Sequence, residues 1–171
     1  TLYPVKTGLF YMIVNDELFA SSDTGAPFNT GLMFPQTEAI ASFEGKVYIV
    51  QGGLLWKFDP VTNQRTTITS RNWTGTQTMT SREGSLYMIQ NNEFLRVRLD
   101  TYGIFTINTL SWPNASSMIY TGSFYYLVSN GVLWSVYMNG RNTNQLGSGN
   151  WNNTKGMTMI SQYLYIVQNS T

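Results

Sequence analysis

The chain has 171 residues, a mass of 19.4 kDa and a formal net charge of +1. Charged side chains make up 11% of it and aromatic side chains 15%, so uncharged polar residues must cover most of the folded surface. This neutrality excludes electrostatic attraction to nucleic acid or anionic lipid, and no apolar run is long enough for a membrane span. The absence of Cys and His excludes disulfides, thiol chemistry, His-based triads and thiolate or imidazole metal sites.

An internal repeat of 39 residues organises the chain. Three ladders of aromatic or apolar residues share this period, and they are Tyr48, Tyr87, Tyr126 and Tyr165; Phe34, Trp73, Trp112 and Trp151; and Ile40, Met79, Met118 and Met157. An apolar pair follows seven residues after most of the tyrosines, as in Leu55-Trp56. A fifth copy lies near the N-terminus, where Tyr11 is followed by Leu18-Phe19.

Each repeat is predicted to hold four short strands, taken here from the copies that show them best. The first strand carries the Met position (77–81), the second the Tyr (47–51), the third the apolar pair (54–58), and the fourth is rich in Thr (65–69). The turn signals between them are Glu44-Gly45, Gly52-Gly53, Asp59-Pro60, Glu83-Gly84, Asn91-Asn92, Asn130-Gly131 and Asn139-Gly140. No window shows a sustained helical period.

This pattern predicts an all-β fold, a β-propeller built from four-stranded blades. The second strand is apolar on both faces, so both faces must be covered. Repeated sheets of about 40 residues covered on both faces are typical of propeller blades. We expect a single domain, 1–171, with repeat units at about 1–35, 36–74, 75–113, 114–152 and, in part, 153–171.

The number of blades has two interpretations. In the preferred one there are five, Leu2–Val5 opens the first, and the last lacks its two outer strands; Leu18-Phe19 and the turn Asp23-Thr24-Gly25 favour this count. In the alternative there are four blades, and the N-terminal strand completes the last one. When Leu2-Tyr3-Pro4-Val5 is placed after Val167 to Thr171, it can take the part of Leu55-Trp56-Lys57-Phe58. In both, an incomplete blade leaves an unpaired edge that the chain's own N-terminus or a neighbouring chain would complete.

The repeat resembles that of lectin propellers of the tachylectin and tectonin type. The likeness lies in the order of the residues, in which a Trp comes first, then Gly45-Lys46-Val47-Tyr48-Ile49-Val50, then the pair Leu55-Trp56. It is seen again in Ser161 to Val167. The resemblance implies non-enzymatic binding of N-acetylated sugars or similar glycans in equivalent pockets between blades.

Candidate binding residues cluster around the Trp ladder. They are Asn72, Trp73, Trp112, Asn114, Asn150, Trp151 and Asn152. Aromatic faces stack on pyranose rings, and asparagine amides donate and accept hydrogen bonds with hydroxyl and acetamido groups. The competing interpretation is that the Trp rings wedge neighbouring blades together. Four sequons make Asn72, Asn114, Asn152 and Asn169 candidate glycosylation sites, which would compete with glycan binding on the same loops.

Two further ladders are interpreted as structural. Gln51, Gln90 and Gln168 end the second strand and are expected to bond the backbone of the next blade. The Met ladder is expected to face the core. The few carboxylates show no acid–base pair, so we expect no enzyme activity, no cofactor and no metal.

Three functions follow from these patterns. The first is a non-enzymatic carbohydrate-binding propeller, extracellular or secreted, with glycans as partners and no binding to nucleic acid or insertion into membranes. The alternative is a structural subunit of an extracellular filament or lattice that joins copies of itself through the terminal strands. The third is an enzyme or scaffold using the axial face. The chain lacks a visible signal peptide and begins with Thr1, as expected for a processed or excised product.

Overall fold

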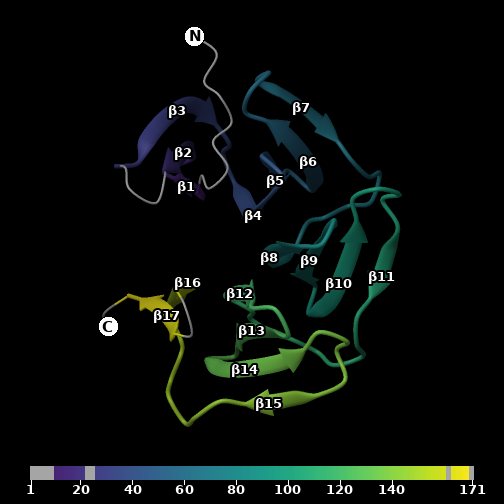
Figure 1. Cartoon of the computed structure of the whole chain (residues 1–171), viewed down its shortest axis with the longest axis vertical. Coiled ribbons are helices and arrows are strands. Elements are labelled where there is room, and N and C mark those ends of the chain that lie inside the picture. The colour runs from purple at the N-terminus through teal and green to yellow at the C-terminus, as the bar shows by residue number, and fades with distance from the viewer. Residues whose placement is uncertain (1–9, 22–25, 161–162, 170–171) are drawn as a thin grey trace. The chain divides into compact units, whose positions relative to one another are not determined.

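The computed structural model describes residues 10–21, 26–160 and 163–169. These residues form strands joined by turns and loops, with no helix among them. The strands make five antiparallel sheets (Figure 1). The chain divides into two compact units, residues 1–75 and 76–171, which are described separately.

The first unit holds two sheets. One has the order β1-β2-β3, with β1 at Phe10–Val14, β2 at Glu17–Ser21 and β3 at Phe28–Met33. The other has the order β4-β5-β6-β7, with strands at Thr37–Phe43, Lys46–Gln51, Leu54–Asp59 and Gln64–Thr67. Strands β1 and β4 lie against each other. Their sheets enclose a core cluster of Leu18, Phe34, Val47, Ile49 and Phe58.

The second unit holds three sheets. Two have four strands each, β8 to β11 (Thr76–Arg82, Ser85–Gln90, Glu93–Arg98, Ile104–Thr106) and β12 to β15 (Ser117–Tyr120, Phe124–Ser129, Val132–Tyr137, Thr143–Gln145). The third pairs β16 (Thr154–Ile160) with β17 (Tyr163–Gln168). Strand β12 lies beside both β8 and β16, so the first strands of successive sheets are neighbours.

Tight two-residue turns connect the strands where the sequence predicted them. Glu44 and Gly45 between β4 and β5 both have positive φ, as do Gly52 and Gly53 between β5 and β6. Two consecutive positive φ values are the requirement of a type I′ hairpin turn, which Gly and Asn adopt at little cost. The turn fixes the register, with Val50 opposite Leu55 and Ile49 opposite Trp56.

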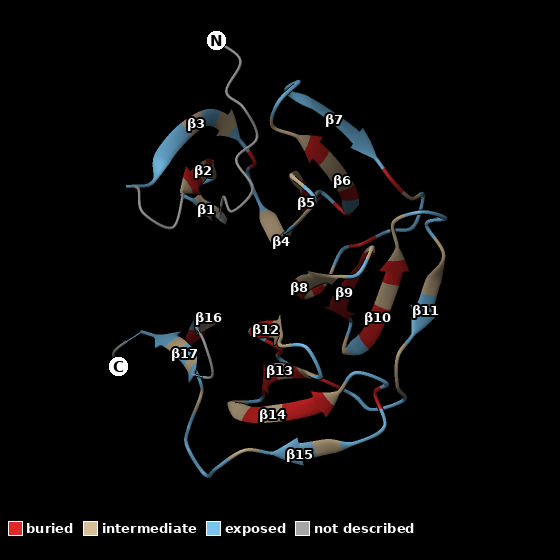
Figure 2. Ribbon diagram, viewed as in Figure 1, coloured by how far each residue is buried: buried red, intermediate tan, exposed pale blue. Residues whose placement is uncertain are grey.

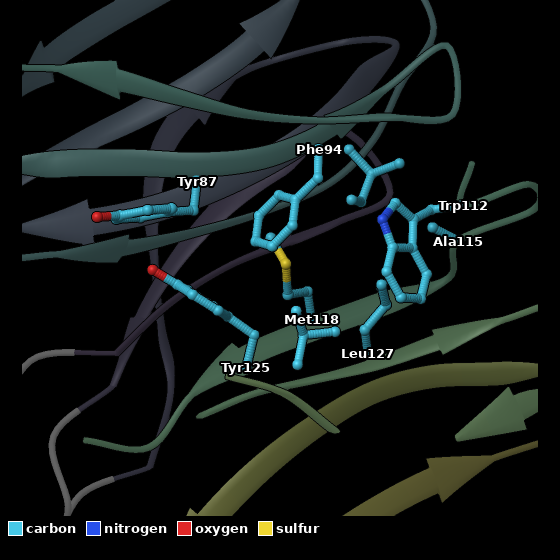
Figure 3. Close-up of a cluster of buried hydrophobic side chains, with 9 residues drawn as sticks. Tyr87, Phe94, Trp112, Ala115, Met118, Tyr125 and Leu127 are labelled. Carbon is cyan, nitrogen blue, oxygen red and sulfur yellow. The ribbon is translucent and has the colours of Figure 1, made fainter. Parts of the chain in front are cut away.

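The core of the second unit lies between its two four-stranded sheets (Figure 3). Tyr87 and Phe94 from the β8–β11 sheet meet Tyr125 from the β12–β15 sheet, with the two tyrosine ring centroids 5.0 Å apart. Met118 is buried in the same cluster, as the core interpretation of the Met ladder predicted. Met79 is also buried, whereas Ile40 and Met157 are half-buried.

The structure confirms an all-β fold of five small antiparallel sheets in the described residues. The last sheet pairs two strands, β16 and β17, which both blade counts predict for the last repeat, so the number of blades stays a prediction. The predicted strand at Leu2–Val5 and the turn at Asp23-Thr24-Gly25 lie outside the described residues. The closure of the sheets into a propeller and the single-domain boundaries stay predictions.

Candidate functional site

One backbone contact recurs at every junction between sheets. The residue of the Phe/Trp ladder donates its backbone N–H to the second turn residue of the preceding sheet. The pairs are Phe34 to Asp16 (2.7 Å), Trp73 to Gly53 (2.8 Å), Trp112 to Asn92 (2.9 Å) and Trp151 to Gly131 (2.8 Å). Each of these loops is therefore hydrogen-bonded to a hairpin turn of the sheet that precedes it. The predicted site residues lie at these contacts.

A second contact ties the same loop to the sheet that it enters. Gln51 donates to the backbone carbonyl of Pro35, Ser129 to that of Pro113, and Gln168 to that of Asn152. The expectation that these side chains bond the next blade is wrong for Gln51 and Gln168, because the loop they hold precedes their own sheet. The reason is the tight hairpin, which returns the end of the second strand to the start of the first.

Two of the three predicted Trp rings are structural. Trp73 is fully buried and Trp112 nearly so, which leaves neither ring face for stacking on a sugar. Trp112 packs edge-on against Trp134, with ring centroids 6.0 Å apart, and joins the core cluster of Figure 3. Their indole N–H groups donate to Thr69 Oγ1 (2.6 Å) and Asn108 Oδ1 (3.2 Å). Trp112 packs between the two four-stranded sheets of the second unit, as the wedge interpretation predicted, because an apolar ring of this size gains more by burial than by exposure.

Trp151 differs from the other two. It is half-buried, and its buried indole N–H finds no acceptor among the described residues. The cause is a sequence change: the acceptor in the other repeats stands four residues before the Trp, and here that position is Gly147. A buried N–H without an acceptor costs about 1–3 kcal/mol, so this junction is the least satisfied of the three.

Asparagine amides converge on the turn beside Trp151. Asn114 Nδ2 donates to Asn130 Oδ1 at 2.8 Å, and both side chains are exposed. Asn152 covers the other turn residue, Gly131, where a Cβ would lie 2.3 Å from Asn152 Oδ1. The three asparagines 114, 130 and 152 are named here the amide cluster. Asn130 was recognised in the sequence only as a turn residue, and the 39-residue register between turn and loop was the signal that placed it here.

Asn72 and Asn150 shape their loops. Asn72 Oδ1 accepts from the Thr74 backbone N–H (2.9 Å), and Asn150 Oδ1 accepts from the Asn152 backbone N–H (3.0 Å). Such side-chain turns are what asparagine does before a tight loop. Asn150 thereby positions Asn152, whereas Asn72 belongs to the first unit and is not placed relative to the amide cluster.

The candidate glycosylation sites are exposed at Asn72, Asn114, Asn152 and Asn169, although the rest of the last sequon lies outside the described residues. The amide cluster contains no titratable side chain. The shifted groups lie elsewhere: the Lys46 ammonium, 2.6 Å away, lowers the pKa of the Asp59 carboxyl, and burial raises the pKa of the Tyr125 phenol.

No group of three or more acidic side chains that could hold a metal ion occurs in residues 10–21, 26–160 and 163–169. Across the same ranges there is no helix long and apolar enough to cross a membrane. The amide cluster holds hydrogen-bond donors and acceptors at exposed positions beside the half-buried Trp151.

No family model and no curated protein matches the chain. Solved structures do match it. A protein of unknown function from Bacteroides thetaiotaomicron aligns over 97% of this chain with 16% identity and a TM-score of 0.71, and the chain covers 51% of it. A nidogen/laminin complex aligns over 94% with 14% identity and a TM-score of 0.69, with 71% of that chain covered. Streptogramin B lyase aligns over 92% with 11% identity and a TM-score of 0.63, with 61% covered.

These neighbours are propeller-like repeat proteins, and at such identities the likeness shows the fold. The chain spans about a quarter of two further matches. One is PorZ, a surface component of the type-IX secretion system of Porphyromonas gingivalis (23%), and the other is the extracellular domain of a putative hybrid two-component system from Bacteroides thetaiotaomicron (26%). Several neighbours are thus extracellular domains or surface components.

Proposed function

We propose that the chain is a non-enzymatic, carbohydrate-binding β-propeller that holds glycans at the amide cluster. The observation that carries the proposal is the convergence of three exposed asparagines on one hairpin turn. Asn114 and Asn130 are joined by a hydrogen bond of 2.8 Å, Asn152 covers the adjoining turn residue Gly131, and the half-buried Trp151 donates its backbone N–H to that residue. Sugar hydroxyl and acetamido groups are matched by such mixed donors and acceptors.

The cluster retains hydrogen-bonding capacity after its internal contact is counted. The Asn114–Asn130 hydrogen bond uses one donor hydrogen and one acceptor, and the Asn152 side chain makes no hydrogen bond to the described residues. Each amide offers two donor hydrogens and an acceptor oxygen, so most of this capacity faces solvent. A ligand whose hydroxyl groups replace the water at this cluster should bind with little rearrangement of the protein. The turn and the loop that carry the asparagines are already joined by a backbone hydrogen bond.

The Trp residues take a different part from that expected. Trp73 and Trp112 are buried, and of the three only Trp151 lies partly at the surface. A ligand oxygen reaching its indole N–H would require the glycine-bearing loop 147–149 to shift, since Gly149 lies close over the indole nitrogen. Such a shift would satisfy a donor that the folded chain leaves without an acceptor.

The resemblance to tachylectin-type lectins and the extracellular neighbours support a secreted glycan-binding protein with N-acetylated sugars as first candidates. We expect a single site of this kind to be weak, and a dissociation constant of about 1 mM corresponds to a binding free energy of about −4 kcal/mol.

The test is a glycan-binding screen with protein made in bacteria, so that its sequons carry no sugar. Wild type is compared with Asn152→Ala and with Asn142→Ala, an exposed asparagine outside the cluster. Loss of the Asn152 amide should weaken binding about ten-fold, equivalent to about 1.4 kcal/mol, and Asn142→Ala should leave it unchanged. No glycan bound by wild type, or equal binding by both variants, would overturn the proposal.

A further inference from the structure

Met138 lies where the chain leaves a buried strand for an exposed turn. Strand β14 is buried or half-buried along its whole length, and Figure 2 shows its red and tan giving way to pale blue beyond its end. Met138 is the first residue after β14, and it is 40% exposed. Its backbone N–H donates to the Ser123 carbonyl at 3.0 Å, which fixes the position of the turn. The thioether can therefore be reached by oxidants in solution while its backbone stays in place.

A cation from the neighbouring sheet lies against this sulfur. Arg82, the last residue of β8, places Nη2 3.8 Å from Met138 Sδ. The guanidinium stacks over the ring of Tyr120, whose centroid is 4.1 Å from Arg82 Cζ. Its Nη2 also contacts Glu83 Oε1 at 3.0 Å. The Arg82 side chain is only 10% exposed, so the guanidinium is held beside Met138 by packing as well as by charge.

Arg82 has hydrogen-bonding capacity that its partners leave unused. Its buried Nε–H finds no acceptor among the described residues, and the Met138 sulfur is a weak acceptor for Nη2. The Glu83 side chain is 73% exposed, so water screens much of the attraction within this ion pair. A guanidinium in this position gains from a stronger acceptor placed within its reach.

We propose that Met138 is an oxidation site whose sulfoxide is bound by Arg82. The oxidant is a hydroperoxide such as hydrogen peroxide. The sulfur lone pair attacks one peroxide oxygen, the O–O bond breaks, and the second oxygen leaves as water with both peroxide protons. The sulfur loses two electrons and the peroxide gains them. The product carries a polar S–O group, whose oxygen is a strong acceptor where the thioether is a weak one, and the Arg82 guanidinium donates a charge-assisted hydrogen bond to it.

Oxidation at this position joins two sheets where it would ordinarily loosen a fold. Methionine sulfoxide disrupts cores because it places a polar oxygen among apolar side chains. At Met138 the oxygen lies between an exposed turn and a guanidinium, and its hydrogen bond links the end of β14 to the end of β8. The amide cluster adjoins the other end of β14, at the turn before Val132, so this site is separate from glycan binding.

Other methionines of the chain provide internal references. Met79 and Met118 are each 6% exposed and should stay reduced under mild treatment with peroxide. Met33 is 56% exposed at the end of β3, in the other unit from Arg82, and should be oxidised with Met138. Peptide mass spectrometry locates the added oxygen at each position.

The experiment measures thermal unfolding of wild type and Met138→Leu, each before and after the same treatment with hydrogen peroxide. Leucine keeps the volume and apolar character of methionine but has no sulfur. Treated wild type should unfold about 2–4 °C above treated Met138→Leu, beyond any difference between the two untreated proteins. Because the other methionines are oxidised alike in both proteins, this comparison isolates position 138.

Met138→Gln provides a second measurement that needs no oxidant, since the glutamine oxygen stands in for the sulfoxide oxygen. It should unfold at a higher temperature than Met138→Leu, and in an Arg82→Leu background this difference should vanish. Met33→Gln and Met33→Leu are the matched pair at an exposed position away from Arg82, and glutamine should bring no gain there.

Two results would overturn the proposal. One is a Met138 that stays reduced while Met33 is oxidised. The other is a midpoint of unfolding that falls or stays the same when position 138 carries the sulfoxide or glutamine. If Arg82→Leu does not fold, the peroxide and glutamine comparisons in the wild-type background still decide the matter. None of these results bears on the glycan screen, so the two proposals fail separately.

Discussion

The amide of Asn152 occupies the space that a side chain at position 131 would need: a Cβ on Gly131 would lie 2.3 Å from Asn152 Oδ1. Gly131 also has φ +69°, a conformation that L side chains rarely adopt. This pair joins the turn of one sheet to the loop that enters the next. It therefore ties the stability of the junction to the geometry of the amide cluster.

Gly131→Ala should lower the free energy of unfolding by about 2–4 kcal/mol, the sum of left-handed strain and the clash with Asn152. Gly122→Ala is the matched control, because Gly122 has φ +81° with open space around it. It should cost only the strain, about 1–2 kcal/mol. Urea denaturation measures both. Adding Asn152→Ala to Gly131→Ala should recover about 1 kcal/mol or more, and strictly additive losses would show that the two residues do not interact.

Asn108→Ala should cost about 2–3 kcal/mol in the same measurement. Asn108 accepts from the Trp112 indole and donates to the Gly140 carbonyl at 3.1 Å, so its removal leaves a buried donor without an acceptor. Thr109→Ala, at the exposed neighbouring position, should change stability by less than about 0.5 kcal/mol. Equal effects at the two positions would refute the role of Asn108 in holding the Trp112 wedge.

The buried phenol of Tyr125 should remain protonated while the protein is folded. Burial, helped by the neighbouring Tyr87, raises its pKa above the ordinary value of 10.0. A pKa raised in the folded state stabilises the fold below the unfolded value, and this contribution is lost as pH rises past about 10. Titration by absorbance at 295 nm should therefore be unchanged by Tyr125→Phe. A loss of titrating absorbance in Tyr125→Phe would contradict the burial of this phenol.

Glycan affinity should be constant between about pH 5 and pH 8. The chain has no histidine, and asparagine amides do not titrate in this range. Titration calorimetry at both ends of the range measures this directly. An affinity change of more than about three-fold would show that a titratable group lies at the binding site. The site would then lie outside the amide cluster.

The sequence predicted the strands and their turns well, because its period and its turn residues are local signals. Gly52-Gly53 and Asn91-Asn92 form the turns that their residue types favour, and these turns set the register of the strands. The site was harder to predict, because the sequence context of a Trp beside Asn does not distinguish a buried ring from an exposed one. Only the structure shows that Trp112 packs on Trp134, and that Gln51 bonds the loop before its own sheet.

The exposure of β17 was equally hidden, since Tyr165 and Val167 have the same sequence context as the buried Tyr48 and Val50. What differs is the pairing, because β5 pairs with β4 and β6, whereas among the described residues β17 pairs with β16. Burial of a strand in a sheet depends on its neighbours, which the local pattern does not encode.

The most direct test of glycan binding at the amide cluster is an NMR titration of ¹⁵N-labelled protein with N-acetylglucosamine. Side-chain amide resonances of Asn114, Asn130 and Asn152 and the indole resonance of Trp151 should shift together with one dissociation constant. The indole of the fully buried Trp73 should not move. Shifts confined to residues away from the Gly131 turn, or none at millimolar sugar, would contradict the account.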